Sequence, residues 1–342
     1  MAGGWLLIET LDHSVPSVIA QGSAVKNMVP VETFFKRSKA KSELLALISR
    51  VCTTAEPERI TLPGNRFAVT EAICNDWGQV HGLWLRIIEE DEQPLAHDRA
   101  WAFVWNLTRG RVTRSKGLAP EGSPEEQDRR EWSIAEAFNI LETGSDASET
   151  LVKIINADPG TIHQTTWPQK RPDGTLHDVN FAVRILLDHV PGRSGADDRI
   201  LRGISHDLGE ANNHDDPESP IMLAELVAAT SADPGEYRAI VDVHSLRLLR
   251  WYGEPSPELV WEYEDLRRLG QPPIHPEDNS VVERMQRELD TGRAVGQVRF
   301  MTKSGNYQPF DLLAKLIVLN RSTTAALVTF RKPLRPFVTD IR

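Results

Sequence analysis

Apolar and polar side chains alternate most regularly near the C-terminal end of the chain. Across residues 307–319 the apolar side chains stand at every second position, which is the period of a half-buried β-strand. The same pattern predicts strands over residues 295–302 and 325–331, with a polar turn at residues 303–306. Residues 281–289 repeat apolar positions at three- and four-residue steps and predict a helix. We therefore expect a helix followed by an antiparallel meander with one apolar face.

Two shorter strands are predicted upstream of this meander, over residues 237–243 and 246–251. Short helical candidates follow at residues 257–264 and 265–269. The resulting order is two strands, a set of helices and three strands. This order resembles a PAS domain.

The middle of the chain repeats the same order. The turn glycine Gly174 takes the place of Gly305, and the helix stop at residues 158–160 takes the place of residues 290–292, as expected of an internal repeat. The predicted elements are a hairpin at 101–107 and 111–114, helices at 131–141 and 147–156, and strands at 161–167, 175–188 and 199–205.

The first ninety residues give a shorter copy in which the pattern does not separate a PAS fold from a GAF fold. Its predicted elements are strands at 5–10, 17–21, 59–62, 67–74 and 79–88 and a helix at 42–51. Taken together, the pattern predicts an α+β protein of three tandem PAS/GAF-like modules, each an antiparallel sheet with helices packed on one face.

The length of 342 residues suits about three modules of roughly 100 residues each. The predicted boundaries place an N-terminal module at 1–90, a middle module at 99–206, an acidic linker with a connecting helix at 207–235, and a C-terminal module at 236–335. The connecting helix is short and apolar, and we expect it to dock between modules or subunits. Its interface candidates are Ile221, Leu223, Leu226 and Val227.

Composition limits the partners and the compartment. The net charge of -10 argues against a nucleic-acid surface. No apolar stretch has the pattern of a signal peptide or a membrane span. Two cysteines, Cys52 and Cys74, in a chain of this length predict a reducing, cytoplasmic location.

Motifs for catalysis, metals or cofactors are not found. The sequence has no phosphate loop, zinc helix or nucleophile elbow, so we expect a protein that is not an enzyme and has no cofactor. Residues 204–208 resemble the phosphoacceptor box of sensor histidine kinases, but Gly209 would break the helix that such a box requires. The acidic residues that follow are expected to be solvated linker. His275 is expected to have a structural role at a helix entrance and not to bind haem.

The remaining candidate site is the hollow between each sheet and its helices. An apolar small molecule could bind there, although side chains at strand spacing more often fill a dry core. The C-terminal candidates are Val241, Phe300, Phe310, Leu312, Leu316 and Val328. The middle-module candidates are Trp101, Phe103, Trp105, Phe181 and Val183.

Three stretches, residues 5–11, 24–30 and 105–110, resemble an actinobacterial, chiefly mycobacterial, family that joins a GAF-like module to two PAS-like modules without an effector domain. The resemblance implies a non-enzymatic cytosolic sensory or regulatory protein that binds a small ligand or a signalling partner. A structural scaffold or dimerisation adaptor is the alternative, and an enzyme with an unrecognised site is a third. A homodimer is one expected assembly.

Overall fold

The computed structural model describes most of the chain, with gaps. The described residues are 4–12, 14–90, 92–93, 96–115, 131–139, 152, 156, 158–171, 174–188, 197–211, 233–243, 246–318 and 324–333. They divide into two compact units. The first unit contains residues 1–130 and 157–214, and the second contains residues 131–156 and 215–342.

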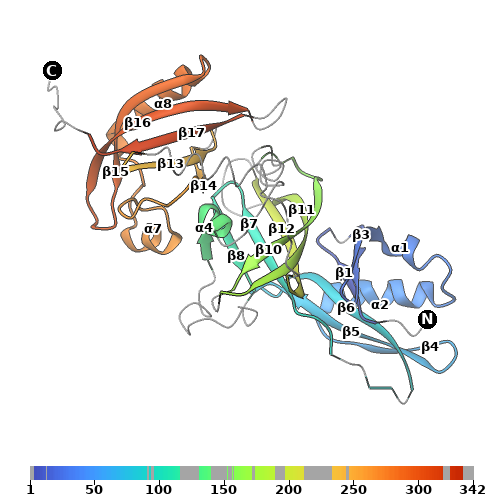
Figure 1. Cartoon of the computed structure of the whole chain (residues 1–342). Helices are drawn as coiled ribbons and strands as arrows, with labels where there is room; N and C mark the ends of the chain where they lie inside the picture. Colours follow the sequence, from blue (N-terminus) through green and yellow to red (C-terminus); the bar gives the residue numbers. More distant parts are fainter. Residues whose placement is uncertain are drawn as a thin grey trace. The chain divides into compact units, whose positions relative to one another are not determined.

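The predicted α+β class is wrong, because strands dominate. Strands make up 50% and helices 18% of the described residues, and the strands form three antiparallel sheets of five or six strands (Figure 1). The sequence pattern identified most strands and predicted helices on one face of each sheet. In the first unit, the first and second sheets also cover each other, which the pattern did not predict.

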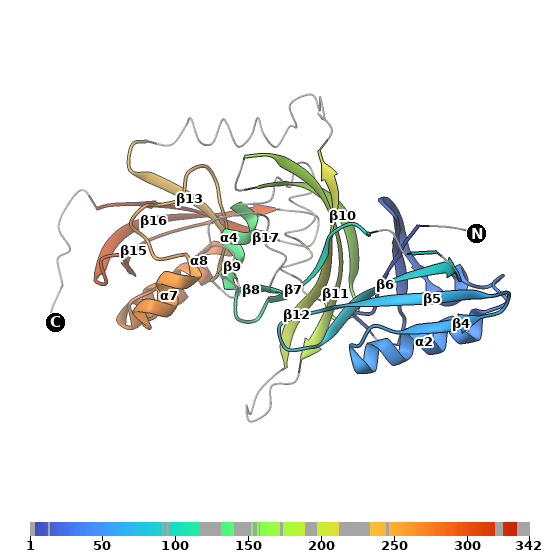
Figure 2. The same ribbon diagram turned by 90° about the horizontal axis from the view of Figure 1, so that it is seen from below.

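The first sheet has the strand order β3-β2-β1-β6-β5-β4. Helix α2 (Lys41–Thr54) buries Leu44, Leu47, Ile48 and Val51 against one face of this sheet (Figure 2). It is preceded by the single turn α1 (Val31–Phe34) and ends where Ala55 takes a left-handed conformation. The strands are β1 (Leu6–Glu9), β2 (Ser17–Gln21), β3 (Ala24–Pro30), β4 (Arg59–Leu62), β5 (Arg66–Cys74) and β6 (Val80–Glu89).

The second sheet lies in the same unit and packs on the other face of the first sheet. Its strands in this unit run in the order β10-β11-β12-β7-β8. Buried residues from both sheets form one core, including Trp5, Leu7, Trp84, Ala102, Ala182 and Ile204. The strands are β7 (Ala100–Asn106), β8 (Arg111–Arg114), β10 (Ile162–Lys170), β11 (Leu176–Asp188) and β12 (Asp198–Glu210).

The third sheet belongs to the second unit and has the order β14-β13-β17-β16-β15. Helix α8 (Asn279–Leu289) packs Met285 and Leu289 into its core. The other elements are β9 (Glu131–Ser133), α4 (Ile134–Asn139), β13 (Glu236–Val241), β14 (Leu248–Trp251), α7 (Tyr263–Leu269), η2 (Pro276–Asp278), β15 (Arg293–Met301), β16 (Tyr307–Val318) and β17 (Thr324–Arg331).

The three sheets share one topology. In each, an initial hairpin is followed by a three-stranded meander whose last strand pairs with the first strand of the hairpin. The first sheet adds β3 at its edge. The internal repeat predicted from the turn glycines is therefore present in the strand order.

Three local predictions are wrong. Residues 131–133, predicted as the start of a helix, form the strand β9. No helix forms at residues 257–262, where Leu259 instead bridges to Thr302. The start of the predicted linker, residues 207–210, is instead strand, because β12 continues to Glu210 and Asp207 is buried beside His206. Pairing with β7 and β11 satisfies the backbone hydrogen-bonding groups of this stretch.

Candidate functional site

Five aromatic rings meet in the core of the third sheet, and we call this group the aromatic core. Phe300, Phe310 and Phe330 come from the three meander strands, Trp251 from β14, and Trp261 from the segment after it. Ring centroids lie 6.1 Å apart for Phe300 and Phe310 and 5.5 Å apart for Phe300 and Phe330. Trp251 lies 5.8 Å from Phe330 and 5.9 Å from Trp261.

The structure brings most of the C-terminal candidates together around these rings. Phe310 is 1% exposed, and Val241, Leu312 and Val328 pack in the same cluster. Leu316 is half-buried and lies outside the cluster. The two tryptophans were not among the predicted site residues.

The tryptophans add polar chemistry to an otherwise apolar core. The indole Nε1 atoms of Trp251 and Trp261 are buried, and neither has a hydrogen-bond partner within the described residues. A buried donor without an acceptor costs about 1–3 kcal/mol, so such a group calls for an explanation. The aromatic core therefore contains two buried N–H donors beside several ring faces.

Residues at the entrance of α8 have structural roles. His275 accepts a hydrogen bond from the Glu277 backbone N–H at the start of η2. Asp278 accepts hydrogen bonds from the backbone N–H of Arg299, at 2.7 Å, and from its guanidinium. Burial alone would raise the pKa of Asp278, but these hydrogen bonds outweigh it and lower the pKa below its ordinary value. The hydrogen bonds between Asp278 and Arg299 attach η2 to β15.

The middle-module candidates share one face of the second sheet. Trp101, Phe103 and Trp105 alternate on β7, and Phe181 and Val183 alternate on β11. The ring centroids of Phe103 and Phe181 lie 6.0 Å apart. Phe103 also covers Gly203 on the neighbouring strand, where a β-carbon would overlap the ring.

Other candidates cannot be placed. Ile221, Leu223, Leu226 and Val227 lie outside the described residues, as does His214 in the acidic stretch. Within the described ranges, no three His, Cys, Asp or Glu side chains are grouped as metal ligands. Among the described helices, none has the length and apolar character needed to cross a membrane.

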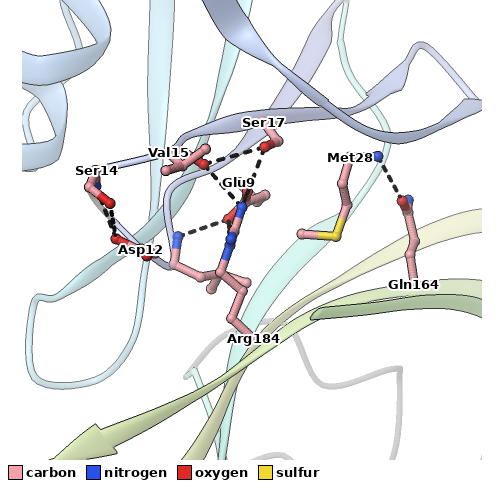
Figure 3. A network of polar contacts seen from close by, with 9 residues as sticks. Glu9, Asp12, Ser14, Val15, Ser17, Met28, Gln164 and Arg184 are labelled. Carbon is pink, nitrogen blue, oxygen red and sulfur yellow. Dashed lines mark hydrogen bonds and ion pairs between the residues drawn. The ribbon is translucent and has the colours of Figure 1, made fainter. Parts of the chain in front are cut away.

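A polar network joins the first two sheets (Figure 3). Arg184 of β11 donates to the Glu9 carboxylate of β1 at 2.6 Å and to the Val15 carbonyl oxygen at 3.0 Å. Glu9 is 0% exposed. Gln164 of β10 accepts from the Met28 backbone N–H at 3.1 Å. These contacts make the first two sheets one packed body.

Residues 105–110, one of the three stretches that carry the family resemblance, also have a structural role. Asp198, at the start of β12, is 1% exposed and accepts hydrogen bonds from Asn106 at 2.9 Å and Arg109 at 2.6 Å. Thr108 accepts from the Arg199 backbone N–H at 2.7 Å. These hydrogen bonds attach the β7–β8 turn to β12.

His206 of β12 is another ionisable group that is 0% exposed in the first unit. Its ring meets Trp84 edge-on at 5.4 Å, and its Nε2 lies 3.3 Å from Asp98 Oδ2. Burial lowers the pKa of His206 below 6.5, and the proximity of His97 adds to this, whereas Asp98 and Asp207 oppose it.

The stability of the first unit is therefore expected to rise with pH toward 6.5. Below that value the unfolded chain binds a proton that folded His206 resists, so stability is lost as the pH falls toward the folded pKa. Urea denaturation followed by tryptophan fluorescence between about pH 5 and 7 measures this slope. A His206→Gln variant with the same slope would contradict the assignment.

The comparisons with known proteins agree with three domains. The Rv3651-like N-terminal, middle-domain and C-terminal-domain models match residues 4–95, 100–207 and 222–339. The crystal structure of an uncharacterised protein from Mycobacterium tuberculosis matches with a TM-score of 0.79 and 25% identity, over 96% of both chains.

Other matches are weaker. An RNA-binding light-oxygen-voltage receptor has a TM-score of 0.25 and 10% identity, over 68% of this chain and 95% of that chain, which carries no argument. Among curated proteins, none matches the chain significantly. The three consecutive models and the full-length likeness show that the chain belongs to the three-domain Rv3651-like family, with N-terminal, middle and C-terminal domains.

Proposed function

We propose that this protein is a non-enzymatic, cytoplasmic regulatory protein whose C-terminal domain senses a small molecule in the aromatic core. This proposal rests on one observation. The buried indole N–H groups of Trp251 and Trp261 have no acceptor within the described residues. A bound acceptor would recover the hydrogen bonds that both donors lose on leaving water. The order of two strands, helices and three strands supports a PAS-like interpretation of this domain.

The chemistry of the aromatic core suggests the class of ligand. The rings pack against apolar and aromatic side chains of the third sheet and of α8. A charged ligand would lose its hydration against these apolar side chains, whereas an uncharged one would not. We therefore expect an uncharged, partly aromatic molecule with a carbonyl oxygen or ring nitrogen as acceptor.

Native mass spectrometry of the full chain purified from its own host tests this function. We expect a reproducible extra mass on the wild-type protein, and its loss in a Trp251→Phe variant, which keeps a ring but removes the N–H. A Trp77→Phe variant is the matched control, because Trp77 is 70% exposed and lies in the first unit. Bare wild-type protein would contradict the proposal.

A scaffold that binds a protein partner is the second candidate. Trp77 favours it, because Asn75 Oδ1 accepts from the backbone N–H of Trp77 at 3.1 Å and of Gln79 at 2.9 Å, which fixes a turn that displays the indole. Exposed tryptophans on ordered turns are frequent anchors of interfaces. Bare protein in the mass spectrum together with a partner lost in Trp77→Ala would support this candidate.

A further inference from the structure

The short segment at residues 131–139 belongs to two domains at once. Its sequence lies within the match to the middle-domain model, residues 100–207. Its coordinates place it in the second unit, with the C-terminal domain. Helix α4 contacts β14, and β9 contacts α7. We call residues 131–139 the docked segment.

The docked segment is buried on nearly all sides. Ile134 is 2%, Ala135 1%, Ala137 5% and Phe138 1% exposed. A helix of one and a half turns is not stable alone in water, so this one depends on the surface that covers it. On β14, Leu249 is only 3% exposed although it lies outside the aromatic core cluster.

Glu136 connects the docked segment to α7. Its Oε2 accepts from the Ser133 backbone N–H at 2.7 Å, and the Glu136 N–H donates to Ser133 Oγ at 3.2 Å, which is a capping box. The same Oε2 accepts from the backbone N–H of Tyr263, the first residue of α7, at 2.8 Å. One carboxylate, 7% exposed, therefore caps two helices from different family domains.

We infer that the C-terminal domain carries a helix-docking surface formed by β14 and α7, and that the docked segment of the middle domain is its built-in occupant. The observations that support this are the burial of α4 and the shared cap, so the inference stands without a ligand. If the proposed ligand binds, β14 and α7 also connect its site to the docked segment. Trp251 ends β14, and Trp261 lies two residues before Tyr263.

Hydrogen exchange of the full-length protein tests the shared cap. In Glu136→Ala, amides at the start of both α4 and α7 should exchange roughly fivefold faster or more, as expected for loss of a helix cap. In the matched control Ser133→Ala, amide exchange should become faster only in α4, because the hydrogen bond from the Tyr263 N–H to Glu136 remains. Equal protection of α7 in the two variants would overturn the shared cap.

A second variant tests the docking surface itself. Phe138→Ser should release the docked segment and speed exchange in β14 and α7, while β16 and β17 keep their protection as a check of folding. Loss of protection in all strands of the third sheet would mean that the segment is inseparable from the fold and would overturn docking. Unchanged amide exchange rates in β14 and α7 would also overturn the docking proposal.

Discussion

Replacing Arg184 by methionine is expected to destabilise the first unit by about 3–5 kcal/mol. The substitution removes the guanidinium that pairs with Glu9 at 2.6 Å and leaves this carboxylate buried and without its cation. The lost attraction is smaller than the cost of the uncompensated buried charge, which dominates the effect. Amide hydrogen exchange of β1 and β11 in the full chain measures this loss of stability.

Two variants serve as controls. Arg50 forms an ion pair with Glu58 while its side chain is 47% exposed, so Arg50→Met should destabilise the unit far less than Arg184→Met. The double variant Glu9→Leu with Arg184→Met should recover much of the loss, because it leaves no charge buried. A double variant as unstable as Arg184→Met alone would contradict this explanation.

The second large effect is expected in the C-terminal domain. Phe310→Ala should destabilise it by about 3–5 kcal/mol, since it removes a ring that is 1% exposed and opens a cavity beside Phe300. Exchange in β15–β17 should accelerate, while that in β1–β6 should not. Val295, 51% exposed on β15, is the matched site, and Val295→Ala should change protection by less than a tenth as much.

Local periodicity was sufficient to predict the meander of the third sheet. Every second side chain from Phe310 to Ala314 is buried, and β16 and β17 were predicted to within one residue of their observed ends. Periodicity was equally informative for α2, whose apolar stripe is buried. Such patterns report which residues avoid water, because the period of the backbone sets which side chains share a face.

The same patterns do not report what covers a buried face. The α+β prediction assigned helices to every sheet, whereas the first and second sheets cover each other with Leu7, Trp84 and Ile204 in one core. Residues 207–210 were misassigned for a related reason. Their polar composition is typical of a linker, and only their pairing with β11 shows that they continue a strand.

The candidate site was partly predictable. Phe300 and Phe310 follow from strand alternation, and they do lie together. The unpaired indole nitrogens do not follow from any pattern, because an N–H lacks a partner only in relation to its folded surroundings. The Glu9–Arg184 pair joins residues 175 positions apart on different sheets, and isolated opposite charges give no local signal.

The indole region of the ¹H–¹⁵N NMR spectrum of the full chain tests the sensor proposal most directly. It should be recorded on protein purified from its own host, before and after the protein is unfolded, dialysed and refolded to remove bound molecules. The proposal predicts that the Trp251 and Trp261 signals shift while the signal of exposed Trp77 stays in place. Identical Trp251 and Trp261 signals in the two samples would contradict a ligand bound at the aromatic core.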